Sequence, residues 1–445
     1  MAIQLPPSPV RPLLTRIISR ALRAVDAAAA VRRAVRKRGH MLIVGTRRYD
    51  LRRYERIIAV GAGKATAPMA QAFERILGKR LDGGIVIVKY GHACQTTLID
   101  VREAAHPLPD RAGQKAAERL LDLVAKLTER DLVIVLLSGG ASSLLPLPVE
   151  GVSLEDKMHV TDLLLRCGAT IGEINTVRKH LSRVKGGRLA QATRATVATV
   201  ILSDVLGDDL SAIGSGPTVP DATTYAQAIE CLKRYRVWLR IPASVRRHLQ
   251  RGSRGLEPET AKPRDATFRR VSHHVVGNVE GAVAAAVQAA KQAGLRTLVH
   301  STGLKGEAGV VGKQFGALAR RIVRSGTPIR RPCCVVAGGE TTVTVTGHGK
   351  GGRAQEFALA AAGAIAGLPQ VWVTALGTDG TDGPTDTAGA VVDGGTAAQA
   401  KHCRPGLEQT LACHDSYRLL KKLHRHIVTG PTGTNVNDLY LLLVL

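Results

Sequence analysis

A glycine-rich segment at 338–357 contains the side chains that most directly suggest anion chemistry. It reads GGETTVTVTGHGKGGRAQEF and places Arg353 at the start of an expected helix. Glycines let the backbone approach a ligand, and the free N–H groups and dipole of a helix N-terminus favour negative charge. A guanidinium adds planar, bidentate donors for a phosphate or carboxylate. The segment predicts an anion site, although a flexible glycine-rich loop would have the same composition.

Four further polar, glycine-rich loops follow expected strands. Open α/β sheets bind ligands outside the carboxyl ends of their strands, so we expect these loops to line a site. A lysine can neutralise an anion, a serine–glycine loop can bind phosphate through backbone N–H groups, and aspartates can hold magnesium or accept a proton. Aspartate is equally typical of turns and helix caps. The loop residues are Lys64 in GAGKAT, Ser138, Gly139, Gly140 and Ser142 in SGGASS, Asp204 in SDVLGDD, and Asp379 and Asp386 in GTDGTDGPTD.

A cationic stretch lies in the expected helical region at 153–192. Asn175, Arg178 and Lys179 are three or four residues apart, so their side chains can point in one direction. Lys185 and Gly186 follow within the same run. A solvated, charged helix face is the common explanation of such a pattern, and an anion site is the functional one.

The elements that must position these loops alternate between strand and helix, which predicts an α/β fold with parallel or mixed sheets covered on both faces. Threonine and valine alternate at 341–346, which predicts a half-buried strand there. Asp110 and Asn278 are expected N-caps. The other strands are expected at 56–60, 84–89, 131–137, 197–202, 271–276, 295–300, 333–337, 371–376 and 439–445, and the helices at 11–38, 66–77, 111–127, 153–192, 279–293, 307–324 and from Arg353.

The length of 445 residues predicts more than one domain. A polar stretch at 251–270, rich in glycine, proline and charge, is the expected linker. We therefore expect two α/β/α domains, at 1–255 and 265–445. The first is expected to be Rossmann-like, because a strand at 56–60 runs into Gly-Ala-Gly and a helix, although only G-x-G of the dinucleotide fingerprint is present.

Composition narrows the classes of partner. The formal net charge is +26, but residues 1–56 carry 14 basic and 3 acidic residues and so supply 11 of these charges. Arginine-rich solvated surfaces explain such a distribution better than specific nucleic-acid binding. No apolar run approaches the roughly 20 residues of a membrane span. The basic helix at 11–38 could be a transit peptide, but its pattern continues without a cleavage zone and favours a folded helix. Seven scattered cysteines favour a reducing cytoplasm.

Motifs along nearly the whole chain, from about 13 to 443, resemble the glycerate 2-kinase family whose C-terminal part is called the MOFRL domain, here about 332–440. The motifs are GAGKA at 61–65, AHPLPD at 105–110, SGGASSLL at 138–145, INTVRKHLSRVKGGRLA at 174–190, SDVLGDD at 203–209, GSGPTVPD at 214–221, GGRAQEFAL at 351–359, GTDGTDGPTD at 377–386 and TGTNVNDL at 432–439. The resemblance implies ATP- and Mg²⁺-dependent phosphorylation of D-glycerate to 2-phosphoglycerate in a cleft between two α/β domains. Its catalytic Lys and Arg would be Lys64 and Arg353.

The roles implied by this resemblance and by the loops can be assigned residue by residue. Lys64 and Arg353 would neutralise the transferring phosphoryl group or hold the glycerate carboxylate. The loop at 138–142, with Lys185 and Gly186, would bind nucleotide phosphates, and Arg178, Asn175 and Glu340 would bind glycerate. Asp204, as a catalytic group or a metal ligand, and Asp379 or Asp386 would hold magnesium or orient the attacking hydroxyl. The number of copies stays open, with a homodimer as one option.

The chain departs from the family pattern at Ala354, where Asn is usual, at Ala141, where Gly is common, and at Leu206, where Pro is common. Losing the Asn would remove one polar contact near the site while leaving Lys64 and Arg353 intact. The alternative function is a hydroxypyruvate reductase, a label this family has also carried. It requires a nicotinamide site, which the incomplete glycine fingerprint disfavours.

Overall fold

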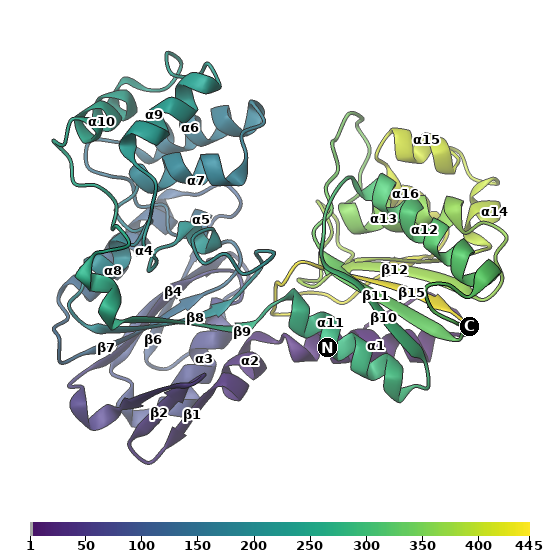
Figure 1. Ribbon diagram of the computed structural model, residues 1–445, viewed down its shortest axis with the longest axis horizontal. Coiled ribbons are helices and arrows are strands. Elements are labelled where there is room, and N and C mark those ends of the chain that lie inside the picture. Colours follow the sequence, from purple (N-terminus) through teal and green to yellow (C-terminus); the bar gives the residue numbers. More distant parts are fainter. Residues whose placement is uncertain (1–2) are drawn as a thin grey trace. The chain divides into compact units, whose positions relative to one another are not determined.

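The computed structural model describes residues 3–445, which form two compact units (Figure 1). One unit is continuous and comprises Ala27–Val276. The other comprises Met1–Asp26 together with Gly277–Leu445. Both contain a six-stranded sheet with helices on its faces, which confirms the α/β class and the pair of α/β/α layers.

The continuous unit is built on a sheet in the order β6-β5-β4-β7-β8-β9. Its registered pairs, β6–β5, β5–β4, β4–β7 and β7–β8, are all parallel. This is the strand order of doubly wound dinucleotide-binding sheets, and the order reverses between β4 and β7. The strands are β4 (Ile57–Ala62), β5 (Gly83–Lys89), β6 (Ile99–Ala104), β7 (Leu132–Leu137), β8 (Thr196–Leu202) and β9 (Val271–Gly277).

Helices of this unit cover the sheet and form a separate helical cluster beyond it (Figure 1). α6, α7, α9 and α10 pack around their own apolar core, which includes Leu164, Ile174, Tyr225 and Leu249. A small antiparallel sheet precedes β4. The remaining elements are α2 (Ala27–Ala34), β1 (Val35–Arg38), β2 (Met41–Val44), β3 (Arg47–Asp50), α3 (Thr66–Leu77), α4 (Arg111–Ala125), α5 (Ala141–Leu144), α6 (Leu154–Arg166), α7 (Ile171–His180), α8 (Arg188–Gln191), α9 (Tyr225–Arg234) and α10 (Ala243–Ser253), with 3₁₀ turns at Leu51–Arg53, Gly78–Arg80, Ile213–Ser215 and Ala266–Arg270.

The other unit has a mixed sheet in the order β10-β11-β15-β12-β13-β14. In this sheet β10 and β11 pair in parallel, and the other registered pairs are antiparallel. β15 lies between β11 and β12 and runs antiparallel to both. α1 and α11 lie on one face and α12, α13 and α16 on the other (Figure 1). The elements are α1 (Arg11–Ala24), α11 (Val279–Gln292), β10 (Arg296–Leu304), α12 (Ala308–Ser325), β11 (Cys333–Gly339), α13 (Arg353–Ala364), β12 (Val371–Gly377), β13 (Gly389–Asp393), α14 (Thr396–Ala400), α15 (Leu407–Ala412), α16 (Ser416–Lys422), β14 (His426–Ile427) and β15 (Asp438–Val444).

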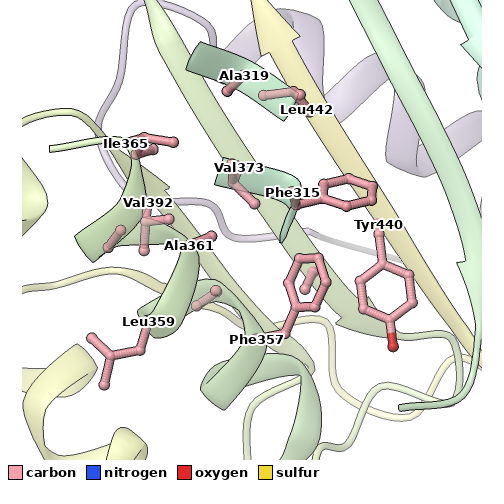
Figure 2. Close-up of a cluster of buried hydrophobic side chains, with 14 of the residues drawn as sticks. Phe315, Ala319, Phe357, Leu359, Ala361, Ile365, Val373, Val392, Tyr440 and Leu442 are labelled. Atoms are coloured by element: carbon pink, nitrogen blue, oxygen red, sulfur yellow. The ribbon is translucent and has the colours of Figure 1, made fainter. Parts of the chain in front are cut away.

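The core between this sheet and its helices contains three aromatic rings in contact. Phe357 of α13 lies 5.2 Å from Phe315 of α12 and 4.5 Å from Tyr440 of β15, measured between ring centroids. Figure 2 shows the three rings side by side, with the Tyr440 hydroxyl directed away from Phe315. All three side chains are buried. Non-parallel aromatic packing of this kind stabilises a core beyond simple area burial, and it fixes the orientation of Tyr440.

The expected single helix at 11–38 is wrong, because the chain breaks at Val25–Asp26 and enters a different unit. α1 buries Leu14, Ile17 and neighbouring apolar side chains and packs against α11. The Thr434 hydroxyl donates to the Val25 carbonyl, and residue 4 pairs with Val428 through the backbone. The helical pattern of the sequence continues across this point, but tertiary contacts end α1 there and α2 begins as a separate helix.

Two other expectations about element boundaries also change. The region at 153–192 is divided into α6, α7 and α8 by turns at Gly168 and Gly186–Gly187, all with positive φ. The expected linker at 251–270 instead folds onto the continuous unit, where the Thr260 hydroxyl donates to the buried Asp221 carboxylate at 3.0 Å. The two compact units divide the chain at 26/27 and 276/277, whereas the expected division lay at 255–265. Asp110 and Asn278 are N-caps, as expected.

None of the helices described at 3–445 is long and apolar enough to cross a membrane.

A half-buried histidine, His426, gives the unit with the mixed sheet a pH dependence. His426 of β14 stacks on Tyr417 at 4.9 Å, its Nε2 is buried without a hydrogen-bond partner in the described chain, and burial lowers its pKa to about 4. Between pH 4 and 6.5 the unfolded chain therefore binds this proton and the folded chain does not. We expect stability to fall as pH drops through this window, by roughly 2–3 kcal/mol in total.

The measurement compares urea unfolding from pH 7 to 4, followed by the fluorescence of Trp372 in a Trp238→Phe background. His426→Gln should remove this part of the pH dependence, whereas the exposed control His402→Gln should keep it. If the free energy of unfolding changed equally with pH in the wild type and in His426→Gln, the assignment would be contradicted.

Candidate functional site

The loops after β4 and β7 meet where the strand order of the continuous unit reverses. The Lys64 N–H donates to the Gly139 carbonyl at 2.8 Å, and the Ala65 N–H donates to Ser138 Oγ at 3.0 Å. A Cβ at Gly63, which has φ of +141°, would lie 2.1 Å from Ser138 Oγ, so only glycine permits this approach. The fold thus brings Lys64, Ser138 and Gly139 together at the position where doubly wound sheets bind ligands.

Ser138 itself is an anchor of the loop. Its side chain is buried, and its Oγ also lies 3.0 Å from the Thr66 hydroxyl. Gly140 follows with φ of +84°, and a Cβ there would be 2.9 Å from the His106 ring and 3.5 Å from Lys64 Cγ. Gly140 therefore holds the Lys64 stem and His106 close to the backbone of the loop.

A buried lysine fixes the other end of the same loop. Lys185 Nζ donates to the Ser142 carbonyl at 2.8 Å, to Ser142 Oγ at 3.1 Å and to the Gly214 carbonyl at 3.3 Å. Ser142 Oγ lies 2.9 Å from Ser215 Oγ, which donates to Asn175 Oδ1 at 3.1 Å. The three N–H donors of Lys185 are thus used within the protein. Lys185 therefore makes the loop rigid, and Asn175 supports the same network.

Gly186 continues this arrangement. It has φ of +58°, and its N–H donates to the Ser215 carbonyl at 3.1 Å. Lys179 of α7 does not take part in this network. It forms a buried ion pair with Asp221 instead, with 3.3 Å between Nζ and Oδ1. Lys179 therefore does not join Asn175, and the shared direction expected from spacing is incomplete.

Arg178 and Lys185 line one cavity of about 320 Å³. A lysine that the sequence reading missed, Lys157 of α6, lines it as well. The signal was available: Lys157 interrupts the buried face of an amphipathic helix between Leu154 and Val160, where an apolar residue is expected.

The predicted metal ligands are not gathered into a cluster. Asp204 lies two residues beyond β8, next to β7 in the sheet. In the other unit, Asp379 Oδ1 accepts from the Thr381 N–H at 3.0 Å, and Asp386 accepts from the Tyr417 hydroxyl at 2.8 Å. Across residues 3–445, no three His, Cys, Asp or Glu side chains form a group that could hold a metal ion.

Arg353 lies at the edge of the mixed sheet where β11 and β12 end and β15 begins. Asp438, the first residue of β15, is in register with both Gly339 and Gly377. Arg353 Nε donates to Asp438 Oδ2 at 2.7 Å, Nη2 to Oδ1 at 3.0 Å, and Nη1 to Glu340 Oε1 at 2.5 Å. The sequence reading identified Arg353 and Glu340, and the structure places them in contact.

Asp438 and Asn437 complete this candidate cluster, and neither was expected from the sequence. Asp438 is buried, and its Oδ2 also accepts from the Tyr440 hydroxyl at 3.0 Å. Asn437, at φ of +65°, donates from Nδ2 to Glu340 at 2.9 Å. Although burial opposes the positive charge, the Asp438 and Glu340 carboxylates raise the pKa of Arg353 above its ordinary value. An acid directly before an apolar strand was the available signal.

The helix N-terminus expected to bind an anion is occupied by the protein itself. Asp382 accepts from the Ala354 N–H at 3.0 Å and from the Gln355 N–H at 2.8 Å, at the start of α13. A Cβ at Gly352 would lie 2.3 Å from the Asp382 carboxyl carbon. The helix N–H groups are therefore satisfied internally, and the cationic chemistry here belongs to the Arg353 guanidinium. Ala354 stands where the family pattern has Asn, and its side chain packs in the apolar core. The polar contact that an Asn would make there is therefore not part of the Arg353 cluster.

The strand expected at 341–346 is wrong, because this segment has no neighbouring strand to pair with. Thr342 bridges to Glu307 instead, and Thr344 donates its N–H and its hydroxyl to the Glu307 carboxylate at 3.1 and 2.5 Å. The following glycines serve close packing rather than a phosphate cradle. A Cβ at Gly347 or Gly349 would lie 2.5 or 2.4 Å from the Cys413 carbonyl oxygen.

Comparisons with known proteins bear on this arrangement. Residues 13–250 match a domain of unknown function, DUF4147, and residues 333–438 match the MOFRL family. A relative from Pyrococcus horikoshii, named glycerate 2-kinase, is 41% identical over 98% of this chain and 97% of its own. The crystal structure of a glycerate kinase from Thermotoga maritima shares 40% identity with a TM-score of 0.86, covering 99% of this chain and 100% of that one.

A third relative, from Agrobacterium vitis, is 41% identical over 87% of each chain and is named putative hydroxypyruvate reductase. Both family matches and the full-length similarity agree with the resemblance found in the sequence and with the α/β fold. The chain belongs to the glycerate kinase family with a C-terminal MOFRL domain.

Proposed function

We propose that the protein transfers the γ-phosphoryl group of ATP to the 2-hydroxyl of D-glycerate in a magnesium-dependent reaction. The observation that carries this proposal is the loop pair at Lys64 and Ser138, placed at the reversal of strand order with a cation and a serine–glycine turn. Phosphoryl transfer needs positioning and charge neutralisation more than covalent chemistry, and these residues supply both.

In this proposal Lys64 neutralises charge on the transferring phosphoryl group, and the backbone at 139–142 binds donor phosphates. Arg353 is the second cation of the proposal, acting in charge neutralisation or in holding the glycerate carboxylate. The guanidinium uses three of its five N–H donors on Asp438 and Glu340 within the described chain, which leaves two for substrate. Its side chain is 33% exposed, so those donors can be reached.

Magnesium fits this residue set through few protein ligands. Protein-bound Mg²⁺ usually takes one or two carboxylates and completes its shell with water and substrate phosphates, so a three-residue cluster is not required. Asp204 would hold it beside the donor-binding loops, and Asp379 is a second candidate. When bound, the ion neutralises phosphate charge.

The test is a coupled assay with ATP, magnesium and D-glycerate, in which enolase consumes 2-phosphoglycerate directly. Signal with enolase alone is the expected result. Signal only after phosphoglycerate mutase is added would move the product to the 3-phosphate. Silence from folded protein in both assays would overturn the kinase proposal.

Reduction of hydroxypyruvate is the second candidate, because one relative carries that name. The geometry after β4 disfavours it. The space at Gly63, where a dinucleotide pyrophosphate would approach the backbone, is filled by Ser138 Oγ. Absence of hydroxypyruvate-dependent NAD(P)H oxidation would dismiss this candidate.

We also propose a cytoplasmic location, because all seven cysteines are free thiols and no pairing stabilises either unit. The partners are then small molecules, ATP and D-glycerate, and a homodimer is compatible with the chain.

A further inference from the structure

The cavity of about 320 Å³ in the continuous unit combines a cationic end with an apolar wall. Its volume lies at the lower end of the range for small-molecule sites. The cationic side chains come from α6, α7 and the turn before α8. The lining includes Ser142, Lys157, Asp162, Leu165, Arg178 and Lys185.

Two cations of this cavity have no acidic partner among residues 3–445. Lys157 is only 6% exposed, and its Nζ is buried without a hydrogen-bond acceptor. Arg178 forms no ion pair, and burial lowers its pKa. Lys185 adds a third amine, whose N–H groups donate to neutral oxygens and whose pKa is lowered well below its ordinary value by burial and by the nearby Lys157 and Arg178. Buried charges are normally paired, so this arrangement is complete only when an anion enters.

The single acid in the lining does not neutralise these cations. Asp162 forms an ion pair with Arg166 at 2.7 Å on the exposed side of α6. Burial and the nearby Arg178 lower the pKa of Lys157 to about 7, which is the expected response of an amine held close to another cation without a counterion. An entering anion favours the protonated form of these amines, so the cavity suits a ligand with more than one negative charge.

Much of the cavity wall is apolar, and part of it is open to solvent. Leu108 and Leu165 are 69% and 56% exposed, although both line the cavity. Pro107, Pro109, Leu154 and Met158 continue this surface. A small hydroxy acid has no group to cover it, whereas a flat heterocycle does. Ser142 connects the cavity to the loop that holds Lys64, through Ser138–Gly140.

We propose that this cavity binds the phosphate donor as a nucleoside triphosphate, with Lys157 and Arg178 on its phosphates and its base against the wall at 107–109 and Leu165. The assignment rests on the proposed kinase function. It moves Arg178 from the glycerate to the donor and adds Lys157 as a donor-binding residue.

The experiment uses the full chain and the variant Lys157→Met, which keeps the stem of the side chain and removes its charge. We expect the Kd for ATP, titrated without glycerate, and the KM for ATP each to rise at least tenfold. The KM for glycerate should stay within twofold. The matched control is Lys115→Met, an exposed lysine on α4 outside this cavity, and it should change none of these values.

Stability separates binding from folding. Removing an unpaired buried charge should leave the melting temperature of Lys157→Met unchanged or raised, so a weaker Kd would report lost binding. An unchanged Kd for ATP overturns the proposal. A rise in the KM for glycerate instead of ATP assigns the cavity to the acceptor and also overturns it.

A comparison of ATP with inorganic tripolyphosphate tests the apolar wall. We expect ATP to bind at least tenfold more tightly, and Leu165→Asp to reduce this difference. Equal affinities overturn the base-binding part. If ATP binds in a Lys157-dependent manner while the coupled assay with D-glycerate stays silent, the donor site stands and the acceptor proposal fails.

Discussion

Replacing Arg353 with methionine is expected to lower kcat/KM for glycerate phosphorylation by about 10²–10⁴-fold, because a charge contact to the transition state would be lost. The same change should destabilise its unit. Asp438 would remain buried without its bidentate partner, next to Glu340 and Asp382. Leaving one member of a buried ion pair alone costs about 3–5 kcal/mol.

A second variant separates these two effects. Adding Asp438→Asn to Arg353→Met removes the uncompensated charge, so the free energy of unfolding should recover in part while activity does not. Unfolding is followed by Trp372 fluorescence, and Arg324→Met on the exposed last turn of α12 is the matched control. Activity of Arg353→Met within threefold of the wild type would exclude a catalytic role.

Replacing Lys64 with methionine is the second change with a large expected effect. Its backbone is fixed by Gly139, and its stem lies against Gly140, so the amine is presented from a rigid turn. Loss of one preorganised charge at the phosphoryl group should reduce kcat by about 10²–10³-fold at saturating ATP and glycerate. The side chain is half-buried, so we expect little change in stability.

Steady-state kinetics with both substrates varied measure this effect, and Trp238 fluorescence reports the fold of the same unit. Lys79→Met, an exposed lysine after α3, is the control and should match the wild type. If Lys64→Met raised only a KM and left kcat intact, the lysine would bind substrate without stabilising the transition state.

Local pattern was sufficient for much of the fold. Apolar runs such as the one at Leu132–Leu137 are long and uniform enough to specify buried parallel strands, and the caps Asp110 and Asn278 act within three residues. The glycine turns after these strands were predictable for the same reason. Each depends on neighbours in sequence, so the loops that contain Lys64 and Ser138 could be located before the fold was known.

Expectations failed where a distant segment supplied the partner. The valine–threonine alternation at 341–346 is typical of a strand, but no neighbouring strand pairs with this segment. Its backbone bridges instead to Glu307, the N-cap of α12. The polar stretch at 251–270 resembles a linker, yet it is held by Asp221. The N-terminus of α13 resembles an open anion site, but Asp382, some 30 residues later, occupies it.

The sequence by itself determined the α/β class, the strand-end loops and the identities of the cations and acids within them, because these follow from local periodicity and turn chemistry. Only the tertiary structure decided which charges are paired. It joins Arg353 to Asp438 across 85 residues, and it leaves Lys157 and Arg178 in one cavity where neither forms an ion pair with a carboxylate of the described chain. Electrostatic pairing depends on distance in space and on burial, and neither quantity is encoded in spacing along the chain.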